Sequence, residues 1–233
     1  AQLPVVNFND VTACGTSTEV SLPCMFAPVG RRNYDEVRIR GSESLLHVAA
    51  RAGVAVHWRD NQSGCKGVCD ALPAMTIDAQ GGRCLDEGLL RGLDERLRAL
   101  HNGRGTQLLV LHMLGNHGPS YYRRYPPAFE RFTPVCRSDD LGRCTREEIV
   151  NAYDNALLYT DHVLATLIGT LSAHAEQVDT AMLFVSCSGV WTADGLSCAV
   201  RGDCALERSL SCGRTRSSPS RPFPRSSCYR WTA

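Results

Sequence analysis

The sequence predicts an α/β domain built on a mostly parallel β-sheet that is covered by helices on both faces. Apolar runs of strand length alternate along the chain with segments that repeat Leu or Ala at helical spacing. The run QLLVLHML at 107–114 is continuously apolar, which is typical of a parallel strand buried on both sides. Strands that alternate with helices favour a parallel sheet with helical crossovers.

The individual elements carry recognisable local signals. The predicted strands are VVNF within residues 1–8, VAVHW at 54–58, QLLVLHML at 107–114 and TAMLFVS at 180–186, the last of them buried. The predicted helices start in 16–22 and cover 42–53, 86–100 and 146–173. Ser and Thr followed by Glu mark the first helix start, and Gly53 is a helix stop. Because chemistry lies beyond the C-terminal ends of parallel strands, segments 9–24, 115–122 and 187 onward are candidates for the site.

Composition and charge exclude several classes of protein. The chain of 233 residues is 43% hydrophobic and 21% charged, with a net charge of +1, so nothing indicates nucleic-acid binding. It contains no continuous apolar run of about 20 residues, which predicts no transmembrane helix within it. Its first residues, AQLPVV, lack a basic segment and an initiator Met. This start is not that of a signal peptide, and we expect a cut end whose upstream part is not in the chain.

Twelve cysteines are a high number for this length. Three pairs are closely spaced: Cys14 with Cys24, Cys65 with Cys69, and Cys136 with Cys144. Short-range pairs of this kind suit disulfides in an oxidising compartment, which for a bacterial protein is the periplasm. Metal binding is the alternative, but neither of the two shortest pairs has a His at zinc-finger spacing.

The composition changes sharply after Ser186. Residues 187–233 hold five Cys, seven Arg and nine Ser but no Lys, His or Ile, and 209–233 have neither helical nor strand periodicity. We therefore predict two parts: a catalytic domain at 1–186, and an aberrant Ser/Arg/Cys-rich tail at 187–233. The tail is either disordered or the product of a frame shift.

Three segments carry side chains suited to phosphate chemistry. Thr18 lies at a helix start, where backbone amides favour anions, but its hydroxyl needs a base or a metal to become a nucleophile. A plain helix cap is the alternative role for this segment. His117 follows the strongest predicted strand in a Gly-rich loop, where it can contact a phosphate or transfer protons. Lys66, the one Lys among 25 basic residues, lies between two cysteines that could pin it in a tight loop.

Four motifs resemble one family. The segments VTACGTSTEVSLPCMF, HWRDNQSGCKGVCD, GNHGPSYYRRYPPAFERFTPVC and NAYDNALLYTD are similar, in order, to those of the bacterial lipid A phosphoethanolamine transferases. That family includes the enzymes of colistin resistance and belongs with the alkaline phosphatase and sulfatase-like folds. The resemblance covers about residues 5–186 and implies such a fold, incomplete at both ends of this chain.

The resemblance assigns roles residue by residue. Thr18 matches the nucleophile, which in the family also contacts zinc. Ser63, Lys66 and His117 match residues that bind phosphoethanolamine. The pairs Cys14–Cys24, Cys65–Cys69 and Cys136–Cys144 match family disulfides. Cys84 also matches a family cysteine, but its usual partner lies in a loop that this chain lacks, so we expect it unpaired or irregularly paired.

The chain departs from the family at the zinc site. The family uses an upstream Glu, the Thr, and an Asp-His pair after the last strand, together with a later His. Here the Glu falls before residue 1, and Cys187-Ser-Gly-Val replaces the family's Asp-His-Gly-Glu. No His follows His174, so Thr18 is the one expected zinc ligand that remains.

The resemblance implies a zinc-dependent phosphoethanolamine transferase that modifies lipopolysaccharide. Its donor would be phosphatidylethanolamine, its acceptor lipid A, and its intermediate a phospho-threonine. It would work at the periplasmic face of the bacterial inner membrane, attached by an N-terminal anchor that is missing here. A sulfatase-like phosphoester hydrolase is the first alternative. The second is an inactive truncated product without a zinc site, and we expect the chain as it stands to be inactive.

Overall fold

The computed structural model describes residue 6 and residues 12–76, 85–101, 103, 105–186, 190–191 and 197–198. The chain divides into two units, residues 1–21 with 183–233, and residues 22–182, which are described separately. The strand predicted within residues 1–8 lies outside the described residues apart from Val6, and so does Cys84. In the tail, β4 (Val190–Trp191) pairs with β5 (Ser197–Cys198) in antiparallel orientation. The domain boundary at residue 186 stays a prediction.

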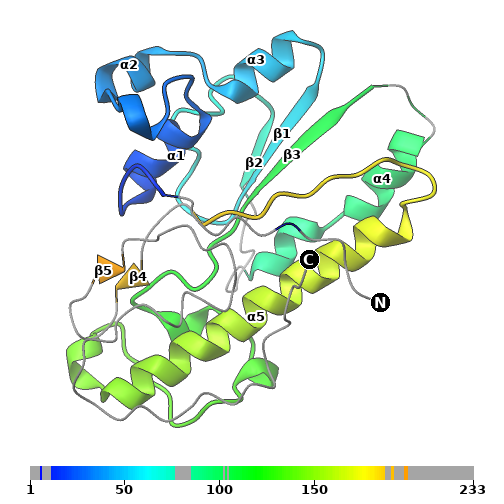
Figure 1. Cartoon of the computed structure of the whole chain (residues 1–233). Helices are drawn as coiled ribbons and strands as arrows, with labels where there is room; N and C mark the ends of the chain where they lie inside the picture. The colour runs from blue at the N-terminus through cyan, green and yellow to red at the C-terminus, as the bar shows by residue number, and fades with distance from the viewer. Residues whose placement is uncertain are drawn as a thin grey trace. The chain divides into compact units, whose positions relative to one another are not determined.

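The second unit is built on a parallel sheet of three strands in the order β2-β1-β3. The strands are β1 (Ala55–Asp60), β2 (Ala74–Thr76) and β3 (Gln107–His112). Strand β1 is central, and its residues pair with β3 from Ala55 opposite Gln107 to Asp60 opposite His112. The predicted parallel α/β class is confirmed. Figure 1 shows α3 on one side of this sheet and α4 and α5 on the other.

Five α-helices and five short 3-10 helices occur in the described residues. The α-helices are α1 (Thr18–Phe26), α2 (Glu36–Gly41), α3 (Leu45–Arg51), α4 (Leu93–His101) and α5 (Arg146–Ala173). The 3-10 helices are η1 (Arg31–Asn33), η2 (Asp86–Leu90), η3 (Tyr121–Arg123), η4 (Pro127–Phe129) and η5 (Leu141–Arg143). The helix predicted at 86–100 is interrupted, because Gly92 has a φ of 67° and separates η2 from α4.

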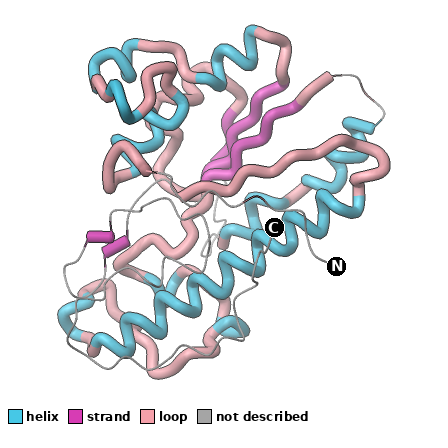
Figure 2. Tube along the Cα trace, viewed as in Figure 1, coloured by secondary structure: helices cyan, strands magenta, loops and turns pink. Residues whose placement is uncertain are grey.

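Helix α5 begins at a capping box and packs along one face. The Thr145 backbone amide donates to Glu148 at 2.7 Å, and the Glu148 amide donates back to the Thr145 hydroxyl at 3.3 Å. Its buried face holds Ile149, Ala152, Ala156, Tyr159 and Val163, which recur at helical spacing. By length and composition alone α5 could cross a membrane. Its buried side chains belong to two hydrophobic clusters, and Figure 2 shows α5 as one unbroken helix.

The core between α3 and the sheet surrounds β1. Leu46 of α3 is completely buried and belongs to one cluster with Val56 and Trp58 of β1. Leu108 and Val110 of β3 pack against this cluster. Full burial of a Leu or Val side chain contributes about 1.5–3 kcal/mol relative to exposure, so Leu46 and Val56 hold α3 against β1.

The prediction of a buried strand at 180–186 is wrong. No strand forms there, Leu183 is 79% exposed and Met182 is 39% exposed. An apolar run becomes a strand only where a neighbouring strand accepts and donates its backbone hydrogen bonds. The described strands pair β1 with β2 and β3, and none of them pairs with 180–186.

Candidate functional site

The C-terminal ends of β1 and β3 carry a buried Asp–His pair. Asp60 ends β1, His112 ends β3, and both are buried. The Nδ1 atom of His112 lies 2.6 Å from Oδ1 of Asp60, and it donates because an ionised carboxylate can only accept. The Asn61 amide extends the ladder by donating to the His112 carbonyl at 3.0 Å. The loops that follow the two strands therefore start side by side.

Asp60 holds the turn that carries Ser63. Its Oδ2 atom accepts hydrogen bonds from the backbone amides of Gln62 and Gly64, each at 3.0 Å. The Trp58 indole donates to Oδ1 at 3.2 Å. Burial raises the pKa of Asp60, but the hydrogen bonds, led by that from the imidazole at the end of β3, outweigh it and lower the pKa to about 2. The ionised carboxylate thus fixes the backbone on both sides of Ser63.

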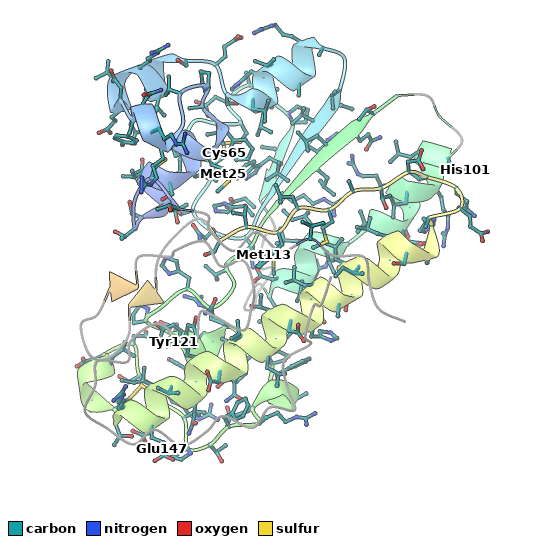
Figure 3. The ribbon with its side chains drawn as sticks, in the orientation of Figure 1. Met25, Cys65, His101, Met113, Tyr121 and Glu147 are labelled. Atoms are coloured by element: carbon teal, nitrogen blue, oxygen red, sulfur yellow. A yellow bond between two sulfur atoms is a disulfide. The ribbon has the colours of Figure 1, made fainter. Side chains whose placement is uncertain are left out.

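The loop closed by the Cys65–Cys69 disulfide places Lys66 beside Ser63. Lys66 has a φ of 54°, and its Nζ donates to the Ser63 carbonyl oxygen at 2.9 Å. Such a left-handed backbone is uncommon for a residue with a side chain, and here the disulfide closes the loop around it. Figure 3 labels Cys65 at the start of this loop. The structure therefore brings two predicted phosphoethanolamine ligands into one small loop.

His117 is exposed in the loop after β3. Its Nδ1 lies 2.8 Å from the Gly118 carbonyl oxygen, and its own carbonyl accepts a hydrogen bond from Nε of Arg124 at 2.8 Å. A Cβ added at Gly118 would lie 2.6 Å from the hydroxyl oxygen of Tyr121, so the close approach requires glycine. The backbone of this loop is held while the imidazole remains accessible.

A carboxylate that the sequence analysis missed joins the two loops. Asp86, the first residue of η2, is buried. Its Oδ1 accepts from the Asn61 side chain at 2.7 Å and from the Leu114 amide at 2.9 Å, and its Oδ2 accepts from the Gly115 amide at 2.7 Å. In the sequence it is one of several acids at a predicted helix start, which gives no sign of this role.

Asp60 and His112 were also missed. In the structure each is the last residue of its strand, at the edge of the sheet where ligands bind in parallel α/β folds. The predicted strands ended at Trp58 and Leu114, so neither residue lay at a predicted strand end.

Thr18 belongs to the first unit and opens α1. It is 9% exposed. The hydroxyl of Ser21 donates to the Gly15 carbonyl at 2.7 Å, and the Ser21 amide donates to the Ser17 carbonyl at 2.9 Å. These bonds fix the turn that leads into the helix. The distances from Thr18 to Ser63, Lys66 and His117 join two units that are described separately, so its membership of their site stays a prediction.

The structure contains two of the disulfides that the resemblance implies. Cys65–Cys69 and Cys136–Cys144 have Cα–Cα distances of 5.8 and 5.6 Å. Cys14 and Cys24 are each disulfide-bonded as well. Their pairing with one another stays a prediction.

Zinc, the cofactor implied by the resemblance, does not fit the residues that the structure describes. Within these residues, no group of three or more His, Cys, Asp and Glu side chains could hold a metal ion. Thr18 is the one predicted ligand among them, and structural or catalytic zinc sites use about three or four protein ligands. Cys187 and its neighbours, which replace the family's Asp-His-Gly-Glu, lie outside the described part.

Comparisons with known proteins agree with this fold and with the resemblance. Residues 3–187 match the sulfatase family. Phosphoethanolamine transferase EptA of Escherichia coli K12 is 41% identical over 192 residues, covering 79% of this chain and 35% of EptA. Phosphatidylethanolamine transferase Mcr-1 of Escherichia coli is 43% identical over 198 residues, covering 79% of this chain and 36% of Mcr-1.

Solved structures give the same result. The soluble domain of lipooligosaccharide phosphoethanolamine transferase A from Neisseria meningitidis is 43% identical with a TM-score of 0.65, over 71% of this chain and 51% of that one. The C-terminal periplasmic domain of EcEptC from Escherichia coli, solved as a complex with Zn, is 27% identical with a TM-score of 0.56. That match covers 72% of this chain and 48% of that one.

The parallel sheet and the joined loops at its C-terminal edge are those of an α/β domain of the sulfatase type. Since the family match extends over most of its residues, the chain belongs to the sulfatase family. The similarity to phosphoethanolamine transferases that the motifs indicate is confirmed. The chain spans about a third of the length of the curated relatives it matches, 35% of EptA and 36% of Mcr-1.

Proposed function

We propose that the activity for which this domain is built is transfer of phosphoethanolamine from phosphatidylethanolamine to a lipid A phosphate. The names of its relatives support the reaction, and the periplasmic domains among its structural neighbours support a periplasmic location at the inner membrane. One structural observation carries the proposal. The loops of Ser63 and Lys66 and of His117 are joined through Asp86 at the C-terminal edge of the sheet.

The proposed reaction has two displacements at phosphorus. The Thr18 hydroxyl oxygen attacks the phosphorus of the donor, the bond to diacylglycerol breaks, and the hydroxyl proton ends on the departing alcohol. An oxygen of the lipid A phosphate then attacks the same phosphorus, the bond from phosphorus to the Thr18 oxygen breaks, and that oxygen takes up the proton of the acceptor phosphate to restore the hydroxyl. Lys66 and His117 would stabilise the charge that develops on the phosphoryl oxygens. The added amine would lower the negative charge of the outer surface and weaken the binding of cationic peptides such as colistin.

The 233-residue chain itself is expected to bind phosphoethanolamine without transferring it. An alcohol with an ordinary pKa is a poor nucleophile at neutral pH, and the segment at 187–190 lacks the family's metal ligands. Metal analysis after dialysis should find no stoichiometric zinc. One tightly bound zinc per chain would contradict this expectation.

A chimera tests the transfer function. Residues 12–182 of this chain would replace the matching segment of full-length Mcr-1, which would supply the rest of the protein. Mass spectrometry of lipid A from cells should show added phosphoethanolamine, and Thr18→Ala in the chimera should abolish it. Equal thermal stability of the two chimeras is the control. Undiminished modification by the Thr18→Ala chimera would exclude Thr18 as the nucleophile.

A phosphoester or sulfate-ester hydrolase is the second candidate, because the matched family is the sulfatase family. It would use the same nucleophile with water as the final acceptor. In purified chimera, release of free phosphoethanolamine at the same rate with and without lipid A would favour hydrolysis. Turnover that depends on lipid A would favour transfer.

A further inference from the structure

Three segments far apart in the sequence meet at the Asp86 carboxylate. Asn61 follows β1, Leu114 and Gly115 follow β3, and Asp86 opens η2. In each of the three contacts, which are 2.7 to 2.9 Å long, an N–H group donates to a carboxylate oxygen of Asp86. Charge-assisted hydrogen bonds are about twice as strong as neutral ones, so this carboxylate ties the two loops firmly together.

From these contacts we infer that Asp86 is a positioning residue. It sets the distance between the Ser63–Lys66 loop and the His117 loop so that both loops bind one phosphate. The inference rests on the proposed role of these loops. Asn61 lies two residues before Ser63, and Gly115 lies two residues before His117. Fixing these two points therefore limits the motion of both proposed phosphate ligands.

Arg124 supports the same loop from its other end. Its Nε donates to the His117 carbonyl at 2.8 Å, and the Asp86 charge interacts with the Arg124 guanidinium. Asp86 at one end of 114–117 and Arg124 at the other thus hold the loop between opposite charges. Gly115, which bonds to Asp86, has a φ of 55°, a conformation that glycine adopts without cost.

These contacts of Asp86 and Arg124 would raise the affinity for phosphate, because they hold the two loops at the binding separation before the phosphate arrives. A phosphate held by groups on two loops loses binding free energy when the loops must first be brought to the right separation. Displacement of about 1 Å in a positioning network can cost about 100-fold in activity. Asp86 itself contacts backbone amides and Asn61, so its effect on the phosphate is transmitted through loop geometry.

Asp86→Asn is the sharpest perturbation because it conserves shape. Both carboxylate oxygens face N–H donors, so in either orientation the new amide NH2 group faces a donor. We expect the Kd of the 233-residue chain for O-phosphoethanolamine, measured by calorimetry, to rise about tenfold, which is about 1.4 kcal/mol. Amide hydrogen exchange at Leu114 and Gly115 should accelerate, while exchange at Val110 and Leu111 in β3 stays unchanged.

Asp94→Asn is the matched control. It removes the same charge from a carboxylate that bonds to His174 and not to the loops, so it should leave both the Kd and the exchange at Leu114 and Gly115 unchanged. If Asp86→Asn does not fold, Asn61→Ala removes one of the three ties and should raise the Kd about threefold, less than the full loss.

The outcomes separate this inference from the proposed function. If the unsubstituted chain binds O-phosphoethanolamine and Asp86→Asn binds it equally well, the positioning role is wrong and the proposed function stands. If the unsubstituted chain does not bind it, the proposed phosphate-binding role of the loops is wrong. In that case, unchanged amide hydrogen exchange at Leu114 and Gly115 in Asp86→Asn would also contradict the positioning role of Asp86. Faster exchange confined to these two amides would support that role.

Discussion

Replacing Asn155 by alanine is expected to lower the free energy of unfolding by about 3 kcal/mol. This side chain of α5 is completely buried. Its Oδ1 accepts from the amides of Arg131 and Phe132 at 2.8 and 2.9 Å, and its Nδ2 donates to the Phe132 carbonyl at 2.8 Å. Each backbone group left without a partner costs about 1–3 kcal/mol, and because these groups are only partly buried we take about 1 kcal/mol for each.

Asn151→Ala provides the matched control on the same helix. Asn151 is half-buried and donates one hydrogen bond, to the Pro134 carbonyl at 2.8 Å. Its loss should cost about 0.5–1 kcal/mol. Alanine favours the helix over asparagine by about 0.5 kcal/mol at both positions, so this gain cancels in the comparison of the two variants.

Urea unfolding with intact disulfides, followed by circular dichroism, measures the difference. The Asn155→Ala midpoint should fall clearly below that of Asn151→Ala at an unchanged slope with urea concentration. Equal midpoints for the two variants would show that the buried amide does not hold the segment around Phe132, and the reasoning from its hydrogen bonds would fail.

Three further predictions concern buried carboxylates and a disulfide. The pKa of Asp60 is lowered to about 2, so its ionised carboxylate should contribute about 2 kcal/mol to the free energy of unfolding above about pH 4. This contribution should be lost as the pH falls toward 2. Urea unfolding of Asp60→Asn should not show this loss. Burial raises the pKa of Asp154 to about 6, so stability should be lost as the pH rises from about 4 to above 6. Urea unfolding at pH 7 should therefore show a free energy of unfolding about 2 kcal/mol higher for Asp154→Asn. Replacing Cys65 and Cys69 by alanine, with a sequence separation of 4, should cost about 2 kcal/mol and weaken calorimetric binding of O-phosphoethanolamine, whereas unchanged binding would show that the loop needs no cross-link.

The sequence analysis worked best where local chemistry decides the structure. The long helix was predicted at 146–173, and α5 spans Arg146–Ala173. Its start is visible in the sequence because Thr145 and Glu148 form a capping box within one turn. The helix predicted at 86–100 passes through Gly92, whose positive φ separates η2 from α4 in the structure.

Strand predictions depended on partners that a single segment cannot reveal. The strand at 54–58 and the run at 107–114 correspond to β1 and β3, which pair with each other. The short β2 was missed, and 180–186 was predicted as a strand with the same apolar pattern but forms none. Apolar composition indicates that a segment can be buried, and the pairing that makes a strand is a property of the whole fold.

Among the residues of the candidate site, those close in sequence could be predicted and those joined only by the fold could not. Ser63 and Lys66 are close in sequence, and the structure brings them together in one loop. Asp86 acts through hydrogen bonds to residues 25 to 29 positions away, and no spacing rule could link them. Motifs therefore located the loops, and only the three-dimensional structure showed which carboxylate joins them.

The strand order β2-β1-β3 also bears on how the isolated chain behaves at high concentration. Within the described residues, β3 pairs with β1 on one side, and no strand covers its other edge. Its sequence QLLVLH contains no Pro and no acidic or Lys/Arg side chain that would discourage another strand from adding to it. An arginine or lysine placed on β3 would oppose such edge-to-edge pairing, because charged side chains on an edge strand discourage the addition of another strand.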